Sequence, residues 1–124
     1  MKLLRNIFKL RPFKESFSYA LQGLAYLVLY HRNMRVIFLC GVLAFLTGLY
    51  FQLKGIELVA LCITVTMVFI AEIFNTAIEL LMDMVNTQYH AMIKVIKDIS
   101  AAVVLIATLN ALAVGYILFS KKVF

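Results

Sequence analysis

One stretch of this sequence places several acidic and amide side chains at helical spacing among apolar residues. At about 100° per residue, the later members project within roughly 60° of the first around a helix. We call this set the polar stripe: Glu72, Asn75, Thr76, Glu79 and Asp83. A carboxylate near lipid costs on the order of 2.5 kcal/mol or more, so a membrane helix that carries several needs a reason. Carboxylates suit a hard cation such as Mg²⁺, so Glu79 is a candidate metal ligand. Glu72, nearer the lipid, is placed to accept a proton from a hydroxyl at the membrane surface.

A structural alternative to this site is a polar seam that holds helices together. Two Glu, an Asn and an Asp on one face exceed what such a seam requires. Lys97 returns to the same side of the membrane and could hold a phosphate, or its ammonium could simply reach the interface. Tyr89-His90 could stack on a base or anchor a loop. Neither GxxxxGK[ST] nor GxGxxG occurs, so a kinase built on these residues uses none of the common soluble designs.

Three apolar stretches must position these residues. Of the 124 residues, 65% are hydrophobic and 15% are charged, which is more apolar surface than a water-facing fold could cover. Each stretch approaches or exceeds the ~20 residues that a helix needs to cross a ~30 Å hydrocarbon core. Three strands could not close a barrel, so only helices fit. The sequence predicts an all-α membrane protein, one domain over residues 1–124, with transmembrane helices at about 34–52, 56–82 and 98–119.

The region before the first stretch is basic and amphipathic. Apolar residues from Phe13 to Val28 recur at helical spacing, which predicts a helix at about 12–31 on the membrane surface. Seven of the twelve Lys and Arg precede position 36, and they favour anionic lipid head groups over nucleic acid as the partner. By the positive-inside rule the N-terminus lies inside, and Asp83–Asp98 forms a cytoplasmic loop.

Together these residues resemble a known family, the prokaryotic diacylglycerol kinases and the closely similar undecaprenol kinases. The resemblance covers nearly the whole chain after residue 12. Its core is Glu72-x-x-Asn75-[Ser/Thr]-Ala-Ile-Glu79 with Asp83, then Tyr89-His90, then Lys97-Asp98 before a small-residue apolar helix. Arg32-Asn33-Met34-Arg35 is similar to the family's segment that enters the first span.

The resemblance implies three transmembrane helices and a surface helix, assembled as a homotrimer with active sites shared between subunits. It implies a multi-pass protein of the bacterial cytoplasmic (inner) membrane that phosphorylates a lipid hydroxyl with ATP and Mg²⁺. Glu72 matches the family's general base, with Asn75 beside it, and Glu79 matches a metal ligand. Glu72, Asn33 and Arg35 are the implied contacts of the lipid substrate. The residues that match ATP contacts are Tyr19, Glu79, Tyr89, His90, Lys97 and Asp98.

One departure from the family concerns metal binding. The family usually has a Glu just before the Arg-Asn pair as a second metal ligand, and here His31 stands there. Imidazole is a poorer partner for Mg²⁺ than a carboxylate. An alternative is therefore a catalytically impaired membrane scaffold. A proton-coupled transporter with Glu72 as its carrier group is a third reading, but it leaves Glu79, Asp83 and Lys97 unexplained. The acceptor is diacylglycerol or undecaprenol, and Arg32–Arg35 with Tyr50-Phe51-Gln52 look more like the undecaprenol kinases.

Overall fold

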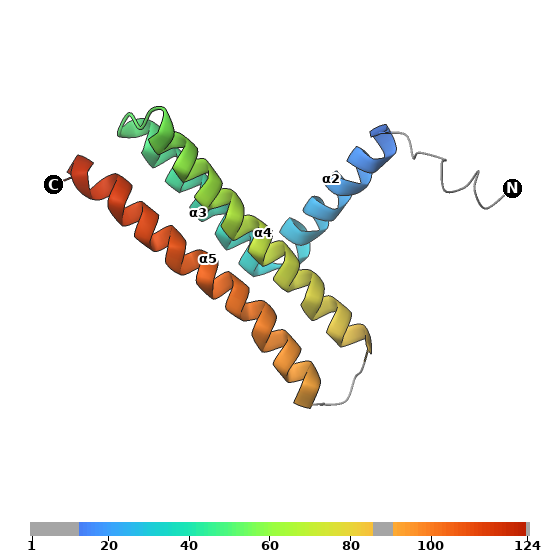
Figure 1. Cartoon of the computed structure of the whole chain (residues 1–124). Helices are drawn as coiled ribbons and strands as arrows, with labels where there is room; N and C mark the ends of the chain where they lie inside the picture. Colours follow the sequence, from blue (N-terminus) through green and yellow to red (C-terminus); the bar gives the residue numbers. More distant parts are fainter. Residues whose placement is uncertain (1–12, 86–90, 124) are drawn as a thin grey trace, which may run out of the picture. The chain divides into compact units, whose positions relative to one another are not determined.

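The described part of the chain consists of long helices (Figure 1). The computed structural model describes residues 13–85 and 91–123. Its helices are α2 (Phe13–Tyr30), α3 (Arg32–Tyr50), α4 (Ile56–Val85) and α5 (Ala91–Val123). Over the described residues α3, α4 and α5 are each long and apolar enough to cross a membrane. The predicted all-α membrane fold with three membrane helices is confirmed.

Helix α2 belongs to a separate compact unit, residues 1–32, and residues 33–124 form the other. Its bounds agree with the surface helix predicted at about 12–31. The apolar side chains Phe13 and Phe17 are exposed and lie one turn apart, with ring centroids 6.4 Å from each other. An exposed apolar face on a helix is suited to the interfacial layer of a membrane.

A tight turn joins α3 to α4. The N–H of Leu53 donates to the carbonyl of Gly48, and the N–H of Gln52 donates to the carbonyl of Leu49. With Gln52 at φ 60°, this is a Schellman motif, which satisfies the last carbonyls of α3. Leu53 is thereby folded back into a small core with Leu61 and Leu118.

Glycine allows α3 and α4 to approach closely, at Gly48 beside this turn and at Gly41 two helical turns earlier. A Cβ built on Gly48 would lie 2.6 Å from Cδ2 of Leu61, and one built on Gly41 would lie 3.0 Å from Cγ1 of Val65. Membrane helices rely on such small residues because no hydrophobic driving force remains between helices in lipid.

Helices α4 and α5 run antiparallel and side by side (Figure 1). Lys97 near the start of α5 contacts Asp83 near the end of α4. At the opposite end, Lys122 Nζ lies 4.0 Å from a carboxylate oxygen of Glu57. These pairs lie at the two ends of the α4–α5 contact, in a register that places the polar stripe opposite the first turns of α5.

The segment predicted as a loop, Asp83–Asp98, is largely helical. Helix α4 continues to Val85 and α5 already begins at Ala91, with residues 86–90 outside the described part. The prediction of a loop was wrong because it followed polarity, whereas a helix can continue beyond the hydrocarbon. An i,i+4 ion pair, Lys94–Asp98 at 2.6 Å, supports the first turns of α5.

Candidate active site

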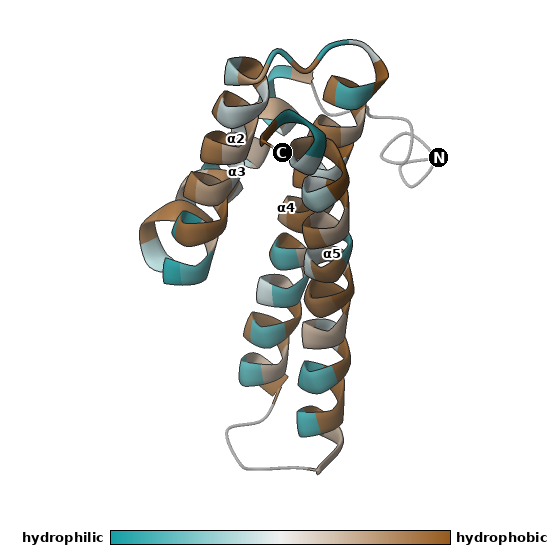
Figure 2. Ribbon diagram, turned by 90° about the vertical axis from the view of Figure 1, so that its left-hand side faces the viewer, coloured by the Kyte–Doolittle hydropathy of each residue, from teal (hydrophilic) through white to brown (hydrophobic). Residues whose placement is uncertain are grey.

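The polar stripe changes from buried to exposed along α4. Glu72 is 5% exposed, Asn75 8% and Thr76 3%, whereas Glu79 and Asp83 are exposed. At 1.5 Å per residue the stripe is about 16 Å long. Figure 2 shows the same change, because hydrophilic ribbon gathers on α4 and α5 toward the ends that adjoin residues 86–90. The stripe thus runs from a buried position at Glu72 to a solvent-accessible one at Asp83.

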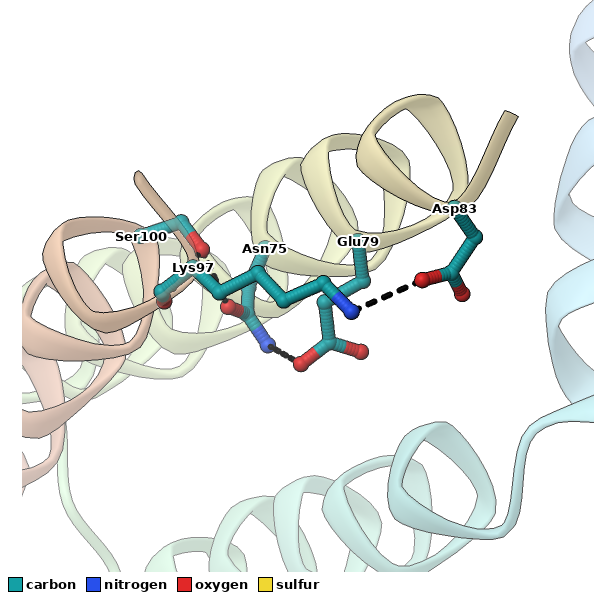
Figure 3. Close-up of polar contacts among 5 residues, drawn as sticks. All are labelled: Asn75, Glu79, Asp83, Lys97 and Ser100. Carbon is teal, nitrogen blue, oxygen red and sulfur yellow. Dashed lines mark hydrogen bonds and ion pairs between the residues drawn. The ribbon is translucent and has the colours of Figure 1, made fainter. Parts of the chain in front are cut away.

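At the centre of the polar stripe, three hydrogen-bonded side chains connect α5 with α4 (Figure 3). The Ser100 hydroxyl on α5 donates to Oδ1 of Asn75 over 2.8 Å, and Nδ2 of Asn75 faces Oε1 of Glu79 at 3.5 Å. Ser100 is itself only 9% exposed. The amide therefore has a fixed partner on each side, and its N–H end points toward the carboxylate expected to bind metal.

One turn toward the helix ends, an ion pair makes a second link between α4 and α5 (Figure 3). Nζ of Lys97 donates to Oδ1 of Asp83 over 2.7 Å, and the two side chains are 38% and 64% exposed. An exposed pair of this kind contributes little to stability, typically 0–1 kcal/mol. Its consequence here is positional, because Asp83 holds the ammonium beside the exposed end of the stripe.

The structure brings together the predicted residues of α4 and α5. Asn75, Glu79 and Lys97 lie in the two linked contacts above, and the buried Glu72 lies about one turn of α4 before Asn75. Asp98 pairs with Lys94 on the same helix rather than with the stripe. The cluster therefore contains the predicted base, metal ligand and phosphate-binding lysine.

The remaining predicted residues lie elsewhere. Asn33 and Arg35 are exposed at the start of α3, on either side of the buried Met34. Tyr19 is exposed on α2, in the other compact unit. Tyr89 and His90 lie outside the described residues, so their ATP contact stays a prediction.

His31 is half-buried at the end of α2. Its ring lies 5.7 Å from that of Tyr26, and its Nε2 is buried with no hydrogen-bond partner among the described residues. Across residues 13–85 and 91–123, no group of three His, Cys, Asp or Glu side chains could by itself hold a metal ion. A magnesium ion here would fit the usual pattern, in which one or two carboxylates act together with substrate phosphates and water. Glu79 remains the carboxylate that the sequence predicts for it.

Sequence reasoning missed Ser100. It stands in an apolar stretch three residues after Lys97, so the same helical spacing that defined the polar stripe could have drawn attention to it. A groove of about 340 Å³ beside this serine is lined by apolar side chains of both helices. Its members besides Asn75 and Ser100 are Ala71, Phe74, Ile78, Ile96, Ile99 and Val103.

Comparison with known proteins identifies the lineage. The profile of the family described as prokaryotic diacylglycerol kinase matches residues 18–119. A diacylglycerol kinase of Synechocystis is 34% identical over 115 residues, which cover 91% of this chain and 66% of that protein. An undecaprenol kinase of Bacillus subtilis is 25% identical over 92% of this chain and 93% of its own length. A diacylglycerol kinase of Escherichia coli K12 is 35% identical over 77 residues, 62% of this chain and 63% of that protein. Since the family profile matches most of the three membrane helices and the whole polar stripe on α4, the chain belongs to the prokaryotic diacylglycerol kinase family.

Proposed function

We propose that this protein is a membrane lipid kinase, which transfers the γ-phosphoryl group of ATP to the hydroxyl of diacylglycerol or undecaprenol. The observation that carries the proposal is the pairing of α4 with α5, which gathers an amide, two carboxylates and a lysine at one end of the helices. Asn75, Glu79 and Asp83 come from α4, and Lys97 comes from α5. Family membership supplies the class of reaction.

Glu72 is the proposed general base. The lipid hydroxyl gives its proton to the Glu72 carboxylate as its oxygen forms a bond to the γ-phosphorus. The bond from that phosphorus to the bridging oxygen breaks, and ADP leaves with the electron pair. The burial of Glu72 supports this role, because a site that excludes water protects the phosphoryl group from hydrolysis.

Charge neutralisation is the task of the exposed part of the stripe. Glu79 would hold Mg²⁺, which when bound offsets the negative charge of the ATP phosphates. Lys97 exchanges its bond to Asp83 for one to a phosphate oxygen, and Asp83 recaptures it after product release. Tyr19, Tyr89, His90 and Asp98 complete the nucleotide site, while Asn33 and Arg35 contact the lipid substrate.

The proposed setting is the bacterial cytoplasmic membrane, with the N-terminus inside and the subunits assembled as a homotrimer that shares its active sites. The basic residues before position 36 support this orientation. Asn110 supports assembly, since it is exposed on α5 about 15 Å further along the helix than Ser100. An amide exposed to hydrocarbon is costly, and an adjacent helix of a second subunit would satisfy it.

The experiment that tests the function is a lipid competition. Purified protein in mixed micelles receives radiolabelled ATP, Mg²⁺ and equal amounts of diacylglycerol and undecaprenol. We expect label in the lipid phase, with undecaprenol preferred because of the similarity at Arg32–Arg35. Label in neither lipid, with folded protein and with Mg²⁺ or Mn²⁺, would leave the non-catalytic scaffold as the better account.

His31 provides a sharp test between the kinase and that scaffold. We expect His31→Glu to lower the Mg²⁺ concentration needed for half-maximal activity by roughly 3- to 10-fold, because a carboxylate binds this hard cation better than imidazole does. The measurement is a Mg²⁺ titration of lipid phosphorylation, with His31→Gln as the uncharged control. Activity that appears only in the Glu variant would show that the natural chain is the impaired form.

A further inference from the structure

Among the described residues, Ser100 is the residue of α5 that hydrogen-bonds the amide of Asn75, and no role follows for it from the family motif. We propose that Ser100 is a positioning residue, which fixes the amide of Asn75 and through it the carboxylate of Glu79. The inference rests on the proposed function, because it gives Asn75 and Glu79 their tasks. It adds a residue of α5 that acts on the metal-binding end of the stripe without touching substrate.

The direction of each hydrogen bond in the chain follows from the chemistry of its members. A carboxylate only accepts hydrogen bonds, so the NH₂ group of Asn75 has to face Glu79. The Oδ1 atom of Asn75 then faces Ser100, and only a donor can satisfy it there. The Ser100 hydroxyl, 2.8 Å away, is that donor.

The Ser100 hydroxyl has a second possible acceptor, which competes with Asn75 for its proton. Its hydroxyl lies 2.9 Å from the carbonyl oxygen of Lys97, one turn earlier in α5. A hydroxyl has a single proton, so it serves one of these acceptors at a time or shares the proton between them. The serine could therefore satisfy itself within its own helix, and the contact with α4 is not needed for its burial.

Removal of the hydroxyl should act on Asn75 rather than on the fold. In Ser100→Ala the buried Oδ1 atom of Asn75 loses its hydrogen-bond donor. A buried acceptor without a donor is unfavourable, because it has lost its hydrogen bonds to water and gains none in the protein. The amide then turns toward other partners, and Glu79 loses the N–H that faces it. Alanine is the best helix former, so α5 itself is preserved.

The test compares Ser100→Ala with Ser100→Thr, which keeps the hydroxyl and has room for its methyl group in the adjoining groove. Thr64→Val is the matched control. Thr64 is also a buried hydroxyl on a membrane helix, but it donates only to the carbonyl of Ala60, over 2.7 Å. For each variant we measure kcat, KM for Mg·ATP, and Mn²⁺ affinity with a non-hydrolysable ATP analogue, from the free-Mn²⁺ signal in electron paramagnetic resonance.

We expect Ser100→Ala to raise KM for Mg·ATP and weaken Mn²⁺ binding by roughly 3- to 30-fold. Ser100→Thr should restore both to within about twofold, and Thr64→Val should leave both unchanged. If Ser100→Ala only destabilised the fold, the fraction of active protein and the apparent kcat would fall, while KM for Mg·ATP and the Mn²⁺ affinity would stay unchanged. In an Asn75→Ala background Ser100→Ala should add nothing.

Two results would overturn the inference. One is an unchanged KM and Mn²⁺ affinity in Ser100→Ala. The other is a double variant, Ser100→Ala with Asn75→Ala, whose fold-changes in KM and Mn²⁺ affinity equal the product of those of the two single variants. Failure of the proposed function looks different. In that case the unsubstituted protein labels no lipid, while the Mn²⁺ measurement still decides whether Ser100 acts on the Glu79 site.

Discussion

Glu72→Gln is expected to lower kcat for lipid phosphorylation by about 10²- to 10⁴-fold, the usual contribution of a general base. Gln has the same size and remains buried, but it cannot accept the proton of the lipid hydroxyl. KM for Mg·ATP should change little, because the proposed nucleotide contacts lie further along the stripe. The measurement is transfer of labelled phosphate to lipid at saturating ATP, with folding checked by circular dichroism and size-exclusion chromatography.

The same helix provides a matched control for this prediction. Glu57 near the start of α4 is also a carboxylate, and it pairs with Lys122 at the end remote from the stripe. Glu57→Gln should keep near-normal turnover. Equal loss in both variants would indicate general damage to α4, and near-normal activity in Glu72→Gln would remove Glu72 from its role as base.

Lys97→Met is the second substitution with a large expected effect. It keeps the apolar stem and helix propensity but removes the ammonium that would neutralise phosphate charge. We expect kcat/KM for ATP to fall by about 10²- to 10³-fold, the range seen when one group that stabilises charge in a transition state is removed. Steady-state kinetics with ATP varied at saturating lipid measure this loss.

Lys122→Met is the control, since Lys122 lies on the same helix and its ammonium also faces a carboxylate of α4, over the longer distance of 4.0 Å. We expect it to keep wild-type kinetics. Asp83→Asn tests whether the placement of the Lys97 ammonium matters separately from its charge. It removes the ion pair with Lys97 but keeps the lysine charge, so the fall in kcat/KM should be several-fold smaller than in Lys97→Met. If Lys97→Met bound and used ATP normally, the assignment of the phosphate site to the paired ends of α4 and α5 would be wrong.

Much of the fold could be predicted because the bilayer imposes simple rules. An apolar stretch of about 20 residues has little choice except a membrane helix, and the three helices were found on that ground. The error at residues 91–98 has the same origin. Hydropathy reports which solvent surrounds a residue, and it does not report whether the backbone is helical there. Ile93 and Ile96, spaced as on one helix face, belong to α5 beyond its apolar part.

The candidate site was predictable only within one helix. Helical spacing placed Glu72, Asn75 and Glu79 on one face, because that geometry depends on a single chain segment. Which residue of α5 meets which residue of α4 depends instead on helix register. That register is the sum of many packing contacts and of the ion pairs at both ends. The Asp83–Lys97 bond and the Ser100–Asn75 bond were therefore visible only once α4 and α5 were seen side by side.

The length of α4 has a consequence for where the reaction occurs. With 30 residues at 1.5 Å each, this helix is about 45 Å long, whereas the acyl region of a bilayer is ~30 Å thick. Glu72 and Glu79 lie on the same continuous helix. The depth of both side chains in the bilayer is therefore set together, by the position of α4 along the membrane normal. Hydrophobic mismatch would raise or lower the whole set of acids relative to the ester layer. If Glu72 is the base proposed above, bilayer thickness is a determinant of which lipid alcohol can reach it.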